Sequence, residues 1–317
     1  MNSERIKFFP ISAFSIILGL TGLAIVFQKA EEIMGFPYKI DTVIISITIA
    51  LFAVISLIYL LKLIKYPHEV VGDFENPVKL SFFPAISISI LLLSIAFLGI
   101  DMMTSKVLWI VGTIIHALFT YKVISIWMMH PKFEIKHINP AWFIPVVGNI
   151  LIPVAGVQHY NPEISWFFYS IGLIFWIVLF TIFMYRIIFF HPLPEKLLPT
   201  LAILISPAAI GFIAYVKLTH QIDSFARILY YFALFLTTFI FTQYKMLSKI
   251  KFYLSWWAYS FPISAMAIAT MLMYHMTEIA VFKYSAYGLI VLLAAVVIIL
   301  IPKTINAVVK GEICLEE

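Results

Sequence analysis

Hydrophobic residues fill most of the chain in long runs, and polar residues gather in short stretches between them. A transmembrane helix needs about 20 predominantly apolar residues to cross a hydrocarbon core about 30 Å thick. Ten runs approach or exceed that length, so the pattern predicts an all-α integral membrane protein forming one domain over residues 1–317. Because the connections are short, consecutive helices are expected to pair as antiparallel hairpins. The predicted spans are residues 9–28, 40–65, 79–100, 106–129, 140–158, 163–190, 196–218, 223–247, 251–276 and 281–309.

Every second span carries a proline beside small residues. The odd-numbered spans contain FFPISAFS, FFPAISIS, FIPVVGNI, ISPAAIGF and SFPISAMA, whereas the even-numbered spans contain no proline before Pro302. Proline and small residues are tolerated at membrane depth where neighbouring helices or water satisfy the backbone. The repeat therefore predicts five hairpins around a central pore, with odd helices inside and kinked at proline, and even helices outside.

The ninth span, KFYLSWWAYSFPISAMAIATMLMYH, places Phe261 ten residues after Lys251. A rise of about 1.5 Å per residue puts this ring roughly 15 Å along the span, near the middle of the hydrocarbon core. Pro262 has no backbone N–H to donate, so a kink is expected there. A ring in a lumen can act as a plug that opens by changing rotamer. Position alone also fits an ordinary packed side chain, since the chain has 29 phenylalanines.

Composition and charge agree with a membrane protein. The chain is 63% hydrophobic and 12% charged, against about 25% charged residues in soluble domains. Fifteen of the 21 Lys and Arg residues fall on the N-terminal side of the predicted spans, which predicts cytoplasmic termini in the cell (inner) membrane. The net charge of +5 mostly reflects this same excess of Lys and Arg on one side of the predicted spans. The basic residues are dispersed among loops, so the sequence predicts no nucleic-acid partner.

Motifs for metal, cofactor or catalytic sites are missing from the sequence. There is no HExxH motif, no glycine-rich phosphate loop and a single cysteine, Cys314, so no metal site and no cofactor are predicted. No carboxylate pair lies in the middle of a span, which argues against an intramembrane aspartyl protease and against a proton- or sodium-coupled transporter built on buried carboxylates. No feature of the sequence supports an enzyme. His116 is the histidine deep inside a span. It is interpreted either as a packing residue hydrogen-bonded between helices or as a proton relay.

Small, hydroxyl-bearing, apolar and aromatic residues are expected to face the lumen. A lumen without fixed acids does not repel anions, and weak solvation by hydroxyl dipoles favours conduction over trapping. Basic residues at the inner mouth raise the local anion concentration. The residues predicted to line the pore are Phe14, Ser15, Phe83, Ser87, Gly148, Asn149, Gly211, Pro262 and Ser264.

The segment WWAYSFPIS at 256–264, with ten spans and prolines in the odd helices, resembles the tellurite-resistance/dicarboxylate transporter family. That family includes the bacterial TehA proteins, the fungal malate and sulfite transporters and the slow-type anion channels of plant guard cells. FPISAFSIILGLTGLA at 9–24 and NPAWFIPVVGNILIPVAG at 139–156 are similar to its first and fifth helices.

The resemblance implies five helical hairpins around a pore, a homotrimer, and occlusion of the pore by Phe261. It also implies a gated channel for small monovalent anions such as chloride and nitrate. The alternative is a secondary transporter or exporter of C4-dicarboxylate, sulfite or tellurite-type oxyanions. Regulation through long phosphorylated tails, as in plant channels, is not expected. The repeat leaves open whether Phe14 or Phe83 shares the plug with Phe261.

Overall fold

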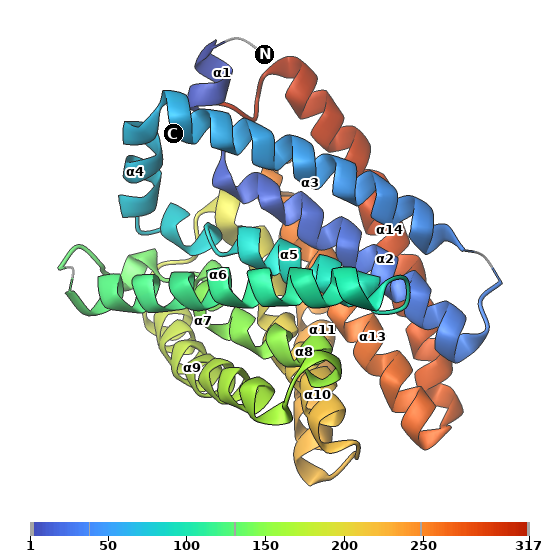
Figure 1. Ribbon diagram of the computed structural model, residues 1–317. Coiled ribbons are helices and arrows are strands. Elements are labelled where there is room, and N and C mark those ends of the chain that lie inside the picture. Colours follow the sequence, from blue (N-terminus) through green and yellow to red (C-terminus); the bar gives the residue numbers. More distant parts are fainter. Residues whose placement is uncertain (1–2, 38, 130, 248, 316–317) are drawn as a thin grey trace.

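The computed structural model describes residues 3–37, 39–129, 131–247 and 249–315, and within them the chain is helical with no β-strand (Figure 1). Nine segments of this part are long and apolar enough to cross a membrane. The prediction of an all-α integral membrane protein is confirmed. The segment expected to cross as the ninth span is a helix, Ser260–Thr277, that is not among the nine.

The α-helices and 3₁₀ helices, the latter marked η, follow one another along the chain. They are α1 (Ser3–Lys7), η1 (Ile11–Ala13), α2 (Phe14–Met34), α3 (Ile40–Lys65), α4 (Pro67–Glu75), η2 (Lys79–Phe82), α5 (Ala85–Phe97), α6 (Met102–Met129), η3 (Ile135–His137), η4 (Pro140–Trp142), α7 (Phe143–Val147), η5 (Gly148–Leu151), α8 (Ile152–His159), α9 (Pro162–Phe189), η6 (Glu195–Leu204), α10 (Ile205–Thr219), α11 (Ser224–Thr242), α12 (Tyr244–Leu247), η7 (Leu254–Tyr259), α13 (Ser260–Thr277) and α14 (Ala280–Lys310).

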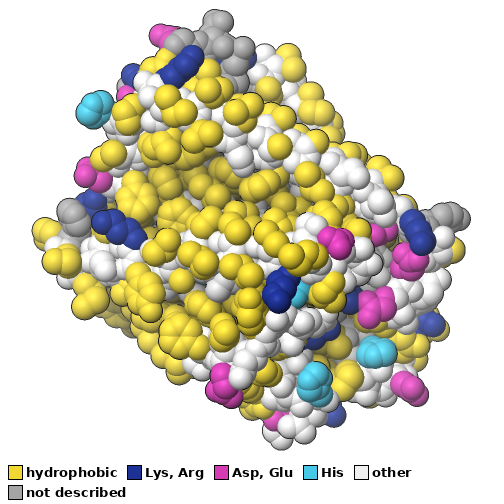
Figure 2. Space-filling model, in the orientation of Figure 1, with side chains coloured by type: hydrophobic (Ala, Val, Ile, Leu, Met, Phe, Trp, Pro, Cys, Tyr) yellow, Lys and Arg dark blue, Asp and Glu magenta, His cyan; other side chains and the backbone are white. Residues whose placement is uncertain are grey.

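Burial divides the nine segments into two groups. In the segments that contain α2, α5, α7 with α8, and α10, between 67% and 83% of the most apolar stretch is buried. In α3, α6, α9, α11 and α14 only 22% to 39% is buried. The outward faces of these five helices carry large hydrophobic side chains, which suit a lipid solvent and not water. Figure 2 shows hydrophobic side chains over the middle of the visible face and most charged side chains towards its edges.

The buried segments form a closed circuit of contacts. α2 packs against α5 and α13, α5 against η5 and α8, α8 against α10, and α10 against α13. Each exposed helix packs on the buried segment before it, so α3 lies on α2, α6 on α5, α9 on α8, α11 on α10 and α14 on α13. At the crossing of α2 and α13, a Cβ atom on Gly19 would lie 2.1 Å from Ser260 Oγ. Only glycine therefore allows this close approach, which positions the start of α13.

The prolines of the odd spans do not kink continuous α-helices, which corrects the sequence prediction. Pro262 is the third residue of α13 and follows the 3₁₀ helix η7, and Pro207 is the third residue of α10 and follows η6. Pro84 directly precedes α5 and follows η2. The N–H groups of a first helical turn have no intrahelical acceptor, so proline there costs little. Each of these prolines thus starts an α-helix where a 3₁₀ segment ends.

The two ends of the described chain lie at the same end of the molecule, here called the terminus side (Figure 1). The Arg5 guanidinium lies against Gly311 at the end of α14. A buried ionic network occupies the same side, where the Lys62 ammonium donates to Asp73 Oδ2 at 2.5 Å and to the Phe9 carbonyl at 3.0 Å. Lys79 Nζ lies 2.9 Å from Asp73 Oδ1. This network attaches α4 to α3 and η2.

Candidate functional site

Two cavities lie inside the circuit of buried helices. The larger, of about 170 Å³, is lined towards its far end by residues from the C-terminal ends of α2, α10 and α13 and is called the opposite-side cavity. The smaller, of about 80 Å³, is lined from the N-terminal ends of the same helices and is called the terminus-side cavity. One water molecule needs only about 10–15 Å³ on this measure. Both cavities therefore have room for several waters or a small ion.

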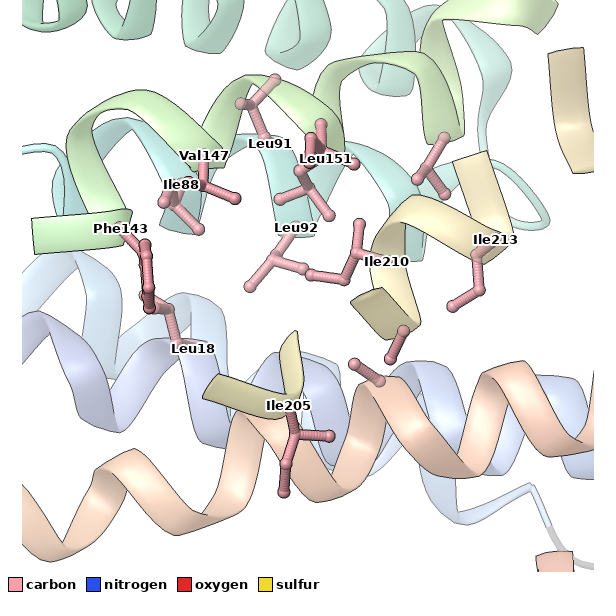
Figure 3. Packing of buried hydrophobic residues seen from close by; sticks show 14 of the residues in the cluster. Leu18, Ile88, Leu91, Leu92, Phe143, Val147, Leu151, Ile205, Ile210 and Ile213 are labelled. Carbon is pink, nitrogen blue, oxygen red and sulfur yellow. The ribbon is translucent and has the colours of Figure 1, made fainter. Parts of the chain in front are cut away.

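Phe261, Leu151 and Ile210 line both cavities and so mark the constriction between them. Phe261 is half-buried and is the second residue of α13. It faces α2 at Gly22, where a Cβ atom would lie 3.6 Å from Phe261 Cδ2. In Figure 3, Leu92 and Ile210 point toward one another, with Leu151 close by. The constriction consists of one aromatic ring and a collar of aliphatic side chains.

The lining residues recur along each buried helix every three or four positions, as one face of an α-helix requires. On α2 they are Ser15, Leu18, Gly22, Ile25, Lys29, Glu32 and Ile33. On α13 they are Phe261, Pro262, Ser264, Ala265, Ile268, Leu272 and His275. Leu151, Ile210 and the charged residues at the mouth of the opposite-side cavity were not predicted from the sequence. Extending the helical period from Ser15 and Phe261 would have located the residues on α2 and α13.

Five of the predicted site residues line the cavities, namely Ser15, Gly148, Phe261, Pro262 and Ser264. The two hydroxyl groups among them are already engaged. Ser15 Oγ donates to the Ser12 carbonyl at 2.6 Å, and Ser264 Oγ donates to the Ser260 carbonyl at 2.9 Å. Their hydrogens therefore point at the helix backbone. Ser206 of the terminus-side cavity differs, because its buried hydroxyl has no hydrogen-bond partner among the described residues.

Phe14 and Phe83, which were predicted to line the pore, line neither of these two cavities. The Phe14 ring is 1% exposed and lies edge-to-face against Phe52 and Tyr59 of α3, with centroids 6.1 Å and 6.2 Å away. Phe83 packs in the same way against Phe74 of α4 at 4.8 Å. Both rings turn away from the cavities into the packing of α3 and α4, so neither shares the constriction with Phe261.

Ser87, Asn149 and Gly211 also line neither cavity, because they face outer helices. Asn149 Nδ2 donates to Thr120 Oγ1 of α6 at 3.0 Å. The Gly211 carbonyl accepts a hydrogen bond from the Tyr169 hydroxyl of α9 at 3.2 Å. Small polar residues on an inner helix can face a lumen or hydrogen-bond to a neighbouring helix. Composition alone does not distinguish these two roles.

His116 is fully buried on α6 and connects that helix to α5. Ser87 Oγ donates to the Pro84 carbonyl at 2.8 Å and lies 2.9 Å from His116 Nδ1. Ser87 Oγ is thus within hydrogen-bond distance of both the Pro84 carbonyl and His116 Nδ1, and the tautomer of His116 decides which atom donates to the other. Nε2 has no hydrogen-bond partner among the described residues, and it lies directly behind Gly148 in the cavity wall.

We expect Gly148→Ala to lower the free energy of unfolding by about 1–3 kcal/mol, because a Cβ there would lie 2.6 Å from His116 Cε1 and 2.8 Å from Ile88 Cδ1. Gly211→Ala is the matched control, since its Cβ would come no closer than 3.8 Å to Leu229. Alanine within a helix is favoured over glycine by up to about 1 kcal/mol. Thermal unfolding in detergent should separate the two variants, and equal midpoints would contradict the close packing at Gly148.

Among the described residues, no three His, Cys, Asp or Glu side chains come together as a metal site. The cavities are instead lined by aliphatic and aromatic side chains, with charges at one mouth. Such an arrangement suits the passage of a small solute.

The sequence profile described as voltage-dependent anion channel, SLAC1, matches residues 8–305. The chain belongs to the SLAC1 family. It is therefore a multi-pass membrane protein, and its relatives are anion channels or transporters. The resemblance to TehA and to the plant slow-type channels is confirmed.

Three relatives illustrate the range of this family. An uncharacterised transporter of Methanocaldococcus jannaschii is 30% identical over 97% of both chains. The S-type anion channel SLAH3 of Arabidopsis thaliana is 29% identical over 83% of this chain and 42% of its own length. The tellurite resistance protein TehA homolog of Haemophilus influenzae is 24% identical over 87% of this chain and 84% of its own.

Proposed function

We propose that this SLAC1-family protein is a gated channel for small monovalent anions such as chloride and nitrate, with Phe261 as the gate. The observation that supports the proposal most directly is the pair of cavities that meet at the Phe261 ring. Leu151 and Ile210 complete the constriction, and neither can hold an ion strongly. A passage that attracts an anion weakly and closes at one ring favours conduction over trapping.

The proposal includes ten crossings in one domain, arranged as five hairpins around the pore. α13 has 18 residues, which gives about 27 Å at 1.5 Å per residue and nearly spans the hydrocarbon core. Its polar content is compatible with a crossing because α2, α10 and α14 pack around it. A helix shielded from lipid by neighbours does not need the hydropathy of an exposed one.

Gating in this proposal is a rotation of the Phe261 side chain. The cavities on either side of the ring offer the space for another rotamer. The excess of Lys and Arg supports a cytoplasmic terminus side in the cell membrane. The exposed apolar faces of the outer helices are the surfaces available to lipid, and to partner subunits in the homotrimer that the family resemblance implies.

A secondary transporter of C4-dicarboxylate, sulfite or a similar oxyanion is the second candidate. It is supported by the closed constriction, which separates the two cavities as alternating access requires, and by His116, whose buried Nε2 has no partner in the described part of the chain. A carrier of this kind should show saturable, pH-dependent uptake that His116→Ala abolishes. A channel should show neither property.

Flux through liposomes containing the purified protein tests the two candidates. We expect chloride and nitrate to permeate faster than malate or sulfite, with a rate that rises with the gradient without saturating at millimolar concentration. His116→Ala should keep this flux if its helix content and elution volume are unchanged. Saturable malate or sulfite transport without chloride conductance would contradict the channel proposal and support the carrier.

A further inference from the structure

Charged residues in the opposite-side cavity are confined to its mouth. Beyond Phe261 the wall consists of aliphatic residues with Gly22 and Ser264, and the far rim carries Lys29, Glu32, Lys217 and His275. Because the serine hydroxyl is bonded to its own helix, the wall itself attracts an anion only weakly. Any electrostatic selection of the solute before it reaches the constriction must therefore come from the rim.

The two lysines of the rim differ in their partners. Lys29 and Glu32 lie one turn apart on α2 and form an ion pair, so their charges largely cancel. Lys217, in the last turn of α10, is half-buried and has no ion pair or hydrogen bond to its ammonium in the described part of the chain. Lys29 and Glu32 are nevertheless close enough to act on its charge. Within the described residues, Lys217 is thus the rim lysine without an ion pair, and it lines the cavity.

We propose that Lys217 forms an anion-loading subsite at the mouth of the opposite-side cavity. It binds a small inorganic monovalent anion, such as chloride or nitrate, before the anion reaches Phe261. The inference deepens the proposed channel function and rests on it. A single cation at a low-dielectric mouth raises the local concentration of the opposite charge. One uncompensated charge matches a monovalent ion, whereas the second carboxylate of a dicarboxylate would meet Glu32 or aliphatic wall.

The test measures chloride current in bilayers in the Phe261→Ala background, where the ring no longer limits flux. Adding Lys217→Met should lower the current carried by anions entering from the opposite side by about threefold or more at 20 mM chloride. The current in the other direction should fall less, so the channel becomes rectifying. At 1 M salt, where the Debye length is about 3 Å, the difference should largely disappear.

Three further variants isolate the charge of Lys217. Lys217→Arg should keep the current, and Glu32→Gln should raise it, because Lys29 is then released from its partner. Lys106→Met removes a positive charge near the start of α6 that lies over the Tyr160 ring and lines neither cavity. It should leave the current unchanged. The subsite is overturned if Lys217→Met and Lys106→Met change the current equally. It is also overturned if Lys217→Met leaves the current unchanged.

Chloride binding measured without conduction separates this inference from the proposed function. ³⁵Cl NMR line broadening on the protein with Phe261 intact should show excess width that Lys217→Met removes and Lys217→Arg keeps. If binding follows this pattern but no variant conducts, the subsite stands and the channel proposal fails. If anion currents are present but neither binding nor current depends on Lys217, the channel stands and the subsite is overturned.

Discussion

Replacing Phe261 by alanine should raise chloride flux at least about tenfold. The ring lines both cavities, so its removal joins them and leaves Leu151 and Ile210 as the narrowest collar. Lowering a barrier by about 1.4 kcal/mol is enough for a tenfold rate change, and removing a hydrophobic plug exceeds that. Currents in planar bilayers or chloride efflux from liposomes measure the effect, with Phe261→Leu expected to fall between wild type and Phe261→Ala.

Phe14→Ala is the matched control for the gate. It removes the same side chain from a buried site at the start of α2, where the ring packs on α3 and lines neither cavity. We expect it to destabilise the protein by about 3–5 kcal/mol, as deleting a buried Phe usually does, without raising the flux per folded molecule. The assignment of Phe261 as the gate would be contradicted by a folded Phe261→Ala variant with wild-type flux. It would also be contradicted if Phe14→Ala and Phe261→Ala raised the flux equally.

The second large effect should come from Asp73→Asn, which we expect to lower the free energy of unfolding by about 3 kcal/mol or more. The Asp73 carboxylate is bonded to both Lys62 and Lys79, and the Lys62 side chain is only 3% exposed. Neutralising the carboxylate leaves a buried ammonium without a counter-charge, and breaking a buried pair in this way costs about 3–5 kcal/mol. Thermal or denaturant unfolding in detergent gives the measurement, and α4 should become accessible to protease first.

Glu69→Gln provides the comparison on the same helix. Glu69 pairs with Lys7 at 3.3 Å, but both side chains are more than a third exposed. Exposed pairs contribute about 0–1 kcal/mol, so this variant should unfold within about 1 kcal/mol of wild type. Asp73→Asn and Glu69→Gln with the same midpoint would show that the Lys62–Asp73–Lys79 network does not hold α4 in place.

Part of this architecture could be predicted from the hydrophobic pattern. The lengths of the apolar runs predicted a helical membrane protein, and the FPISA-type repeat identified which segments are buried. These features follow from local composition, because lipid exposure selects apolar side chains and inner helices tolerate proline and small residues. The motif around Phe261 also pointed to the residue that the structure places between the two cavities.

Other features depended on rotation and register, which short motifs do not encode. The sequence left open whether Phe14 or Phe83 shares the plug with Phe261, because the repeat does not fix their depth, and in the structure these rings pack on α3 and α4. Gly148 and Gly211 looked alike in the sequence, yet one lines a cavity and the other faces α11. A rotation of about 100° per residue along an α-helix is enough to move a side chain from lumen to interface.

The sequence by itself predicted a membrane protein whose helices alternate between buried and exposed, and the family motif in it pointed to Phe261. Only the tertiary structure decided that Pro84, Pro207 and Pro262 lie where an α-helix follows a 3₁₀ segment and that Leu151 and Ile210 line both cavities with Phe261. It also decided that Lys29 is paired, whereas Lys217 has no ion pair within the described residues. The physical reason is that lipid exposure acts on each segment separately. The lining of a cavity and the pairing of a charge depend instead on how five helices are rotated against one another.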